Sequence, residues 1–289
     1  MARIRIVTDS AVQFADPAWA ERLGVVVVPH TIQFGNQTFR EGIDITPEEF
    51  FRRVALGDPK PVALPPTVED FTRVYTGLAR TSDYILSIHT SGKLSRAYRH
   101  AKTAADALLG RTQVRVVDSM TISRGLGILV EAAMHAVEEG RALDEIVRLV
   151  RGMISSIYMV FVVEDLAYLE RSGRMGPAQA ILGTMLGIKP FLTIEEGDLI
   201  PMEKVRSRDK AVEKLLEFIT EFADIAELTI LQSARHPTED TRMLLDRLTE
   251  EYPNQEFSVR MYGPTLGCFI GPNSLGVLVY EAEDHGTGF

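Results

Sequence analysis

The sequence lacks the features that mark secreted and membrane-embedded proteins. Its 289 residues include one cysteine, Cys268, so the chain cannot form an internal disulfide. The longest apolar runs, such as residues 158–163, have the length of a strand, whereas a membrane helix needs about 20 apolar residues. The chain opens on a strand-like stretch, residues 3–7, without the apolar region of a signal peptide. We therefore expect a cytoplasmic protein.

Positive charge and catalytic motifs are also scarce. The formal net charge is −9 and no run rich in Lys or Arg is present, so we expect no nucleic-acid partner and at most a transient contact with membranes. The sequence has no G-x-S-x-G elbow, no P-loop, no G-x-G-x-x-G after the first strand and no spaced Cys or His ligands. These absences predict a protein without a metal, a cofactor or a catalytic residue set, which binds a small molecule and does not transform it.

The pattern of apolar residues predicts an α/β protein in two parts. In the first part, β-branched runs alternate with segments of helical period, which is typical of a parallel sheet; the runs are residues 4–8, 25–34, 84–89 and 114–118. In the second part strands outnumber helices, and a turn at residues 195–198 joins two of them, which favours antiparallel pairing; the strands are residues 158–163, 191–194, 199–205, 228–232, 257–261, 266–270 and 276–280. We predict an N-terminal α/β/α domain with a parallel sheet (1–160), and a C-terminal α+β domain with a mostly antiparallel sheet (161–289). The ligand would lie between them.

Small polar residues follow the strands of the first part. Residues 8–10 (TDS), 89–92 (HTSG), 118–119 (DS) and 123–127 (SRGLG) supply hydroxyl and backbone N–H groups, and ligands gather at the carboxyl ends of parallel strands. The pattern predicts a donor-rich floor that suits an oxyanion, with ordinary helix capping as the alternative for each element. A second alternative is an acyl hydrolase in which Ser91 is the nucleophile and His89 the base.

The second part supplies a positive group. A glycine-flanked turn, residues 171–177, places Arg174 just before a predicted helix, where a guanidinium and a helix N-terminus would attract an anion. The helix behind it, residues 181–188, is apolar nearly all round and includes Leu186. Such a helix forms either core or the wall of a tunnel for an apolar tail.

These motifs together resemble the DegV family, and the resemblance runs from Ile6 to Tyr280. The matching segments stand in the family's order: residues 7–10 (VTDS), 42–46 (GIDIT), 94–95 (LS), 117–119 (VDS), 123–127 (SRGLG), 173–174 (GR), 187–190 (GIKP), 204–206 (KVR), 271–272 (GP) and 275–276 (LG).

The resemblance implies a carrier of long-chain fatty acids. It implies an acyl chain in a tunnel between two domains, with its carboxylate at Ser91 and Arg174. A separate fatty acid kinase subunit, similar to dihydroxyacetone kinases, would phosphorylate that carboxylate for phospholipid synthesis, and Arg206 falls on a position that looks like kinase-facing surface. We expect a monomer. The residues expected around the ligand are Thr8, Asp9, Ser10, Ala63, Thr90, Ser91, Ser95, Ser123, Arg174, Leu186, Phe269 and Ile270.

The sequence departs from the family pattern at the expected head-group site. Ala63 stands where the family has a threonine, and Phe269 and Ile270 stand where it has His-Thr. Each buried methylene contributes about 0.8 kcal/mol, so a chain of about sixteen carbons contributes on the order of ten and dominates affinity. The departures therefore leave tail binding intact, and they raise the alternative that the ligand is a neutral or different apolar lipid.

Overall fold

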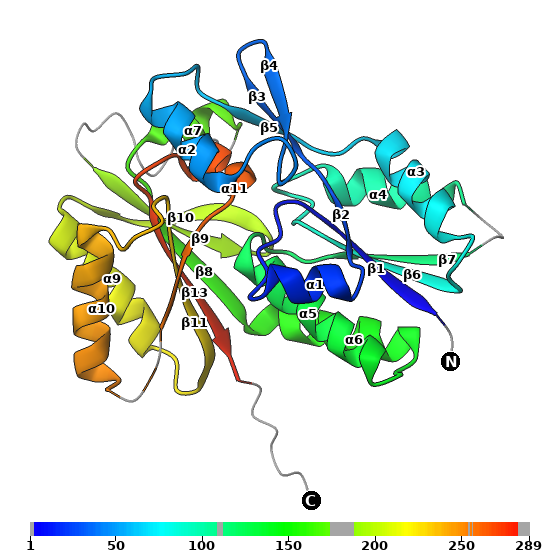
Figure 1. Cartoon of the computed structure of the whole chain (residues 1–289). Coiled ribbons are helices and arrows are strands. Elements are labelled where there is room, and N and C mark those ends of the chain that lie inside the picture. The colour runs from blue at the N-terminus through cyan, green and yellow to red at the C-terminus, as the bar shows by residue number, and fades with distance from the viewer. Residues whose placement is uncertain (1–2, 109–111, 174–187, 254, 256, 283–289) are drawn as a thin grey trace, which may run out of the picture.

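A computed structural model describes residues 3–108, 112–173, 188–253, 255 and 257–282 (Figure 1). Two of the residues predicted to contact the ligand, Arg174 and Leu186, lie outside this part of the chain. The described chain forms one parallel sheet, one larger and mostly antiparallel sheet, and a small third sheet.

The N-terminal domain is built on the four-stranded parallel sheet. Its order is β2-β1-β6-β7, from strands β1 (Ile4–Asp9), β2 (Val26–Val28), β6 (Tyr84–His89) and β7 (Gln113–Asp118). Helices α3 (Val68–Leu78) and α4 (Ala97–Asp106) cover one face, and α5 (Arg124–Glu138) and α6 (Leu143–Met153) cover the other. A short helix, α1 (Pro17–Arg22), follows β1.

Strand alternation explains why both faces are covered. In β1, Val7 packs with α3 and α4 while its neighbour Ile6 packs toward α5 and α6. Ile85 and Leu86 of β6 divide in the same way. Because successive side chains of a strand point to opposite faces, an apolar run of this kind requires helices on both sides.

The C-terminal domain is built on the six-stranded sheet. Its order is β10-β9-β8-β13-β11-β12, from β8 (Ile157–Val162), β9 (Lys189–Glu195), β10 (Asp198–Val205), β11 (Ile225–Gln232), β12 (Ser258–Met261) and β13 (Leu275–Glu281). All neighbours are antiparallel except β11 and β12. Helices α9 (Arg208–Thr220) and α10 (Glu239–Glu251) lie together on one face (Figure 1). The predicted fold class is therefore confirmed, while the boundary at residue 160 stays a prediction, since β8 runs across it.

A small antiparallel sheet and three helices lie together on one side of the two large sheets (Figure 1). The sheet has the order β4-β3-β5, from β3 (Thr31–Phe34), β4 (Gln37–Arg40) and β5 (Val62–Leu64). The helices are α2 (Pro47–Ala55), α7 (Leu166–Arg171) and α11 (Pro264–Ile270); a 3-10 turn, Ile154–Ser156, precedes β8. Helix α11 packs against β5, α2 and α7.

Two strand predictions were wrong. Residues 25–34 do not form one strand, because Pro29 and His30 break the run and send β2 and β3 into different sheets. Residues 266–270 form the end of helix α11 and not a strand, and Pro264 stands in its first turn, where the missing N–H costs nothing. A short apolar run is compatible with either element, and here the proline marks the helix.

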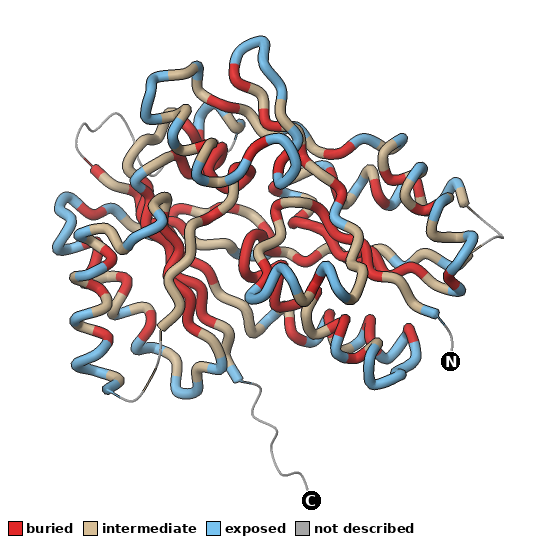
Figure 2. Tube along the Cα trace, viewed as in Figure 1, coloured by how far each residue is buried: buried red, intermediate tan, exposed pale blue. Residues whose placement is uncertain are grey.

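The two large sheets share a hydrophobic core. One cluster of buried residues includes Leu86 and Ile88 from the parallel sheet as well as Phe161, Leu192 and Leu278 from the larger one. Figure 2 shows the buried residues running along both sheets and through the elements between them.

A buried ion-pair network crosses the same junction. Arg124 of α5, 3% exposed, donates to the Glu227 carboxylate of β11 over 2.7 and 2.8 Å, to Glu131 over 2.7 Å and to the Gln13 carbonyl over 3.1 Å. Arg124 thus links α5 and the loop after β1, on the side of the parallel sheet, to β11 of the larger sheet.

Candidate functional site

The carboxyl ends of β1 and β6 meet in a buried polar cluster. Asp9 accepts hydrogen bonds from the Thr90 backbone N–H at 2.9 Å, the Thr90 hydroxyl at 2.7 Å and the Ala11 N–H at 3.2 Å. The His89 Nδ1 lies 3.0 Å from Asp9 Oδ2, the oxygen that also accepts the Thr90 N–H. All of these groups are buried. Adjacent parallel strands therefore bring the predicted polar ends together, but largely to satisfy one another.

A second buried carboxylate extends this cluster. Glu41, which follows β4, accepts from the Ser10 hydroxyl at 2.7 Å and from the Thr265 N–H at 2.9 Å and hydroxyl at 2.5 Å. His30 places Nδ1 3.4 Å from the Ser10 oxygen and Nε2 3.0 Å from the Ser95 oxygen. A chain of hydrogen bonds thus connects α11 to the loop before α4.

Burial acts differently on the ionisable groups of the cluster. Burial alone would raise the pKa of Asp9, but the hydrogen bond from His89 and the nearby His30 ring bring it down to about 2. Burial raises the pKa of Glu41 to about 7 in spite of its bonds from Ser10 and Thr265. Burial also lowers the pKa of His30, against the attraction of Asp9. At neutral pH Asp9 is thus ionised and Glu41 is close to its midpoint.

Two predicted head-group residues already have hydrogen-bond partners. The Thr90 hydroxyl proton is used by Asp9, as described above. Ser91 is fully buried, and its hydroxyl donates to the Gly197 carbonyl at 2.6 Å, in the turn that joins β9 to β10. The predicted turn at residues 195–198 is therefore present and closes over Ser91 from the other sheet.

The apolar members of the predicted site that the structure describes form an apolar wall, because α11, which carries Phe269 and Ile270, packs against β5, which carries Ala63. Phe269 and Ile270 on α11 are 4% and 0% exposed, and both belong to the hydrophobic cluster against which Ala63 of β5 packs. Leu94, three residues after Ser91, is part of the same cluster.

Three further predicted residues, Ser123, Thr8 and Arg206, have different surroundings. The Ser123 hydroxyl donates to the Gln13 side chain at 3.2 Å, on the side of the interface where Arg124 lies. The hydroxyl of Thr8 is buried and makes no hydrogen bond with the described residues. Arg206 follows the end of β10 and is exposed.

The geometry does not assemble the Ser91 and His89 pair of the hydrolase alternative. The two ring nitrogens of His89 lie 3.0 Å from Asp9 and 2.6 Å from the Ser87 hydroxyl, while the Ser91 hydroxyl is directed to Gly197. A nucleophile needs its base within hydrogen-bond reach, and here His89 has both nitrogens committed elsewhere.

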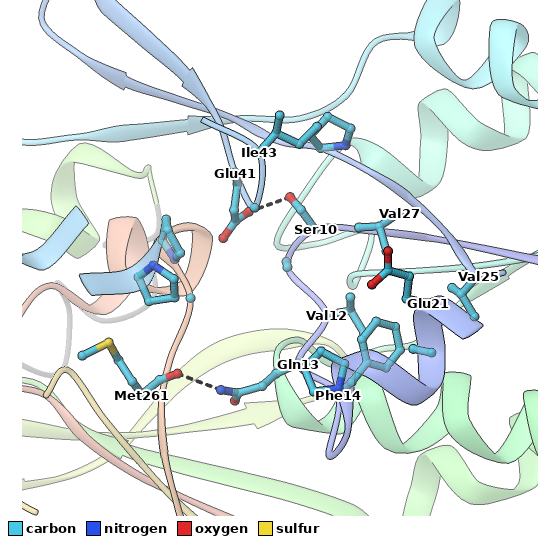
Figure 3. Close-up of a pocket in the computed structure, with 18 of the residues that line it drawn as sticks. Ser10, Val12, Gln13, Phe14, Glu21, Val25, Val27, Glu41, Ile43 and Met261 are labelled. Carbon is cyan, nitrogen blue, oxygen red and sulfur yellow. Dashed lines mark hydrogen bonds between the residues drawn. The ribbon is translucent and has the colours of Figure 1, made fainter. Parts of the chain in front are cut away.

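A pocket of about 680 Å³ opens beside the polar cluster, in front of the loops that follow β1 and β2 (Figure 3). The Ser10–Glu41 hydrogen bond lies at one end and a bond from Gln13 to the Met261 carbonyl, 2.7 Å, at the other. Of the predicted ligand residues that the structure describes, only Ser10 lines it. The described residues that line it are Ser10, Ala11, Val12, Gln13, Phe14, Pro17, Ala20, Glu21, Val25, Val27, Pro29, Glu41, Gly42, Ile43, Pro47, Arg260, Met261, Gly263 and Pro264.

Sequence reasoning missed His30, Glu41 and Thr265. His30 interrupts an apolar run beside Pro29, and Glu41 precedes a glycine with φ +77°, so both stand at turns where polar side chains are common. Nothing local pairs Glu41 with Thr265, which is 224 residues away.

Two further features concern metal ions and membranes. Among the residues that the structure describes, no group of three or more His, Cys, Asp or Glu side chains is placed to hold a metal ion. No helix in the described ranges has the length and apolar character needed to cross a bilayer.

The fold and the site define a class: an α/β protein with two large sheets, in which strands of the parallel sheet end in a buried polar cluster. The sequence model of the DegV family, described as an uncharacterised protein family, matches residues 3–282. The chain belongs to the DegV family.

Relatives and solved structures agree with this assignment. A DegV domain-containing protein of Streptomyces coelicolor is 35% identical and the match covers 96% of this chain and 98% of that one. A Thermus thermophilus structure, described as fatty acid binding of a DegV family protein, is 32% identical with a TM-score of 0.84, covering 97% of this chain and 100% of the other. The fatty acid kinase B3 protein of Streptococcus pneumoniae, loaded with linoleic acid, has a TM-score of 0.80 and covers 97% and 100%; at 20% identity this likeness shows the fold.

Proposed function

We propose that this protein binds a long-chain fatty acid between its two large sheets and presents the carboxylate to a separate kinase subunit. The observation that carries the proposal is the similarity to the Thermus thermophilus fatty acid-binding protein, which extends over nearly the whole chain at 32% identity. The polar strand ends and the apolar wall of Ala63, Phe269 and Ile270 support it.

The head group would be held by Ser91 together with Arg174. In the structure the Ser91 hydroxyl donates to a single oxygen, the Gly197 carbonyl, at 2.6 Å. A fatty acid carboxylate oxygen offers the same kind of acceptor with a full charge, and such bonds are roughly twice as strong as neutral ones. Ligand binding would then displace the turn around Gly197 from Ser91. Asp9, which is ionised, would repel a carboxylate, so we assign it the positioning of Thr90 and not a ligand contact.

The tail would pack along the apolar wall formed by β5 and α11. Each methylene removed from water contributes about 0.8 kcal/mol, so a chain of about sixteen carbons outweighs the loss of one hydrogen bond at the head. Phe269 and Ile270 add apolar surface where the resemblance leads one to expect polar groups. The wall therefore favours tail binding over strict head-group recognition.

Delivery to a kinase is supported by the position of Arg206. It is exposed where β10 ends, and an exposed guanidinium at the end of an edge strand is open to a carboxylate of a partner protein. We place the kinase contact there, in line with the expected family role.

Lipid analysis tests the proposal directly. Folded protein purified from cells should release about one long-chain fatty acid per chain on organic extraction, as measured by mass spectrometry. Ser91→Ala and Arg174→Ala should each lower affinity for added fatty acid, whereas Ser155→Ala, at an exposed serine, should not. Protein without stoichiometric lipid that also fails to take up added fatty acid would refute the assignment.

A neutral or bulkier apolar lipid is the second candidate, favoured by the apolar residues Phe269 and Ile270. In that case Arg174→Ala would leave affinity unchanged, because no carboxylate faces the arginine. The extracted lipid would then lack an acidic head.

A further inference from the structure

The pocket in front of β1 and β2 is not explained by fatty acid binding. Its lining includes neither Ser91 nor Ala63 nor Phe269, and its volume of about 680 Å³ lies within the range of small-molecule sites, roughly 300 to 1,000 Å³. It opens at the carboxyl ends of parallel strands, where α/β proteins bind ligands. We propose that this pocket is a second site that binds an organic primary amine, with the ammonium group at Glu41 and Ser10 and an apolar body toward Val25 and Val27.

The charge of the pocket selects a cation. Its lining includes two carboxylates, the buried Glu41 and the exposed Glu21. A third carboxylate, the buried Asp9, lies close enough to act electrostatically on Glu41. Among the lining residues that the structure describes, one is a cation, Arg260, whose Nη1 lies 3.4 Å from each of the Phe14 and Ala15 carbonyls. A ligand carboxylate would meet like charge at the polar end, while an ammonium group would be attracted.

The shape of the chain leaves one oxygen of Glu41 approachable from the pocket. A Cβ placed on Gly263 would lie 3.1 Å from Glu41 Oε1, and one placed on Gly42 would meet nothing within 4 Å. Both glycines line the pocket. Because neither glycine carries a side chain, an ammonium group has room beside the carboxylate of Glu41, a residue that is 4% exposed.

Hydrogen-bond chemistry fits the same ligand. The Oε1 atom of Glu41 accepts the Thr265 N–H at 2.9 Å and has a lone pair left. The Ser10 oxygen donates to Glu41 and accepts the His30 N–H at 2.8 Å, which leaves it one further lone pair. Burial raises the pKa of Glu41 to about 7, so a cation in contact would stabilise its ionised form. An ammonium group brings three donors and a positive charge to this corner.

The remaining walls suit an apolar body of modest size. They are formed by aliphatic, aromatic and proline side chains, and the rim includes two exposed ones, Val27 and Ile43, at 40% and 60%. Such a lining with few convergent polar groups is typical of small-ligand pockets.

Three matched probes test the proposal on the whole chain as purified, with its lipid in place: 3-phenylpropylamine, 3-phenylpropan-1-ol and 3-phenylpropanoate. Isothermal titration calorimetry should show the amine binding at least about tenfold more tightly than the alcohol, and the carboxylate more weakly than both. Equal affinity of amine and alcohol, or no binding of the amine, would overturn the proposal.

Two variants locate the amine. Gly263→Ala places a methyl group against Oε1 at an ordinary backbone conformation (φ −75°, ψ 166°), and Glu41→Gln removes the charge. Each should lower amine affinity about tenfold or more, with thermal unfolding checking that the variants are folded. The fatty acid content of Gly263→Ala should not change, which separates this site from the proposed fatty acid site. Unchanged amine affinity in both folded variants would refute the assignment to this pocket.

Discussion

Replacing Asp9 by Asn tests whether the buried carboxylate holds the strand ends together. Asp9 accepts hydrogen bonds from Ala11, from the Thr90 N–H and hydroxyl, and from His89, all to a side chain that is 0% exposed. An Asn has one acceptor oxygen and an NH2 group that must face one of these donors. Leaving buried donors without their charged acceptor costs about 1.5 to 3 kcal/mol, and we expect the free energy of unfolding to fall by about that amount at pH 7.

The pH dependence separates this explanation from a general packing defect. The pKa of Asp9 is lowered from 3.8 to about 2, which corresponds to about 2.4 kcal/mol at 1.36 kcal/mol per unit. A lowered pKa contributes stability that is fully present above pH 3.8 and is lost as the pH falls toward 2. The difference between wild type and Asp9→Asn should therefore be constant above about pH 5 and shrink by about 2 kcal/mol between pH 4 and pH 2.

Urea unfolding followed by circular dichroism across this pH range measures the effect. The matched control is Asp44→Asn, because the pKa of Asp44 is also lowered to about 2, by the hydrogen bond and charge of Arg40, but the pair is exposed. An exposed pair contributes little to stability, so this variant should stay close to wild type. The reasoning fails if the two Asn variants lose equal stability, or if the Asp9→Asn difference does not change with pH.

Three other predictions follow from buried contacts. Glu227→Ala leaves the Arg124 guanidinium without its bidentate partner and should lower the free energy of unfolding by about 3 kcal/mol; a loss below about 1 in urea titrations would contradict the network. Gly197→Ala would place a Cβ against the Ser91 hydroxyl at φ +82°, so the turn should move away from Ser91 and the affinity for added fatty acid should change. An unchanged affinity would contradict a role of this turn in closing the fatty acid site. Burial raises the pKa of Glu41 from 4.5 to about 7. The free energy of unfolding of the wild type, relative to that of Glu41→Gln, should therefore fall by about 3 kcal/mol as the pH rises from 4.5 to 7 and change little above pH 7. A difference that does not depend on pH would disprove this.

Local signals in the sequence predicted much of the fold. Thr46 accepts from the Glu49 N–H and Thr67 forms a capping box with Asp70, so capping residues close in sequence mark the starts of α2 and α3. The turn at residues 195–198 follows from its glycine, which adopts φ +82°. These features depend on neighbours in sequence, and so they can be read from it.

The candidate site was only partly predictable, because its contacts are not local. The polar ends of β1 and β6 were expected to meet, since adjacent parallel strands end at one edge. The bonds from His30 to Ser95 and from Thr265 to Glu41 join residues 65 and 224 positions apart. No spacing rule links such pairs, and the helical form of residues 264–270 that presents Thr265 was itself mistaken for a strand.

The shared core has a consequence for folding. Phe161, Leu192 and Leu278 of the larger sheet are buried in the same cluster as Leu86 and Ile88 of the parallel one. A fragment ending near residue 156 would expose this apolar surface to water. We therefore expect the chain to unfold in a single cooperative transition, with calorimetric and van't Hoff enthalpies that agree, and neither half to serve as an independent module.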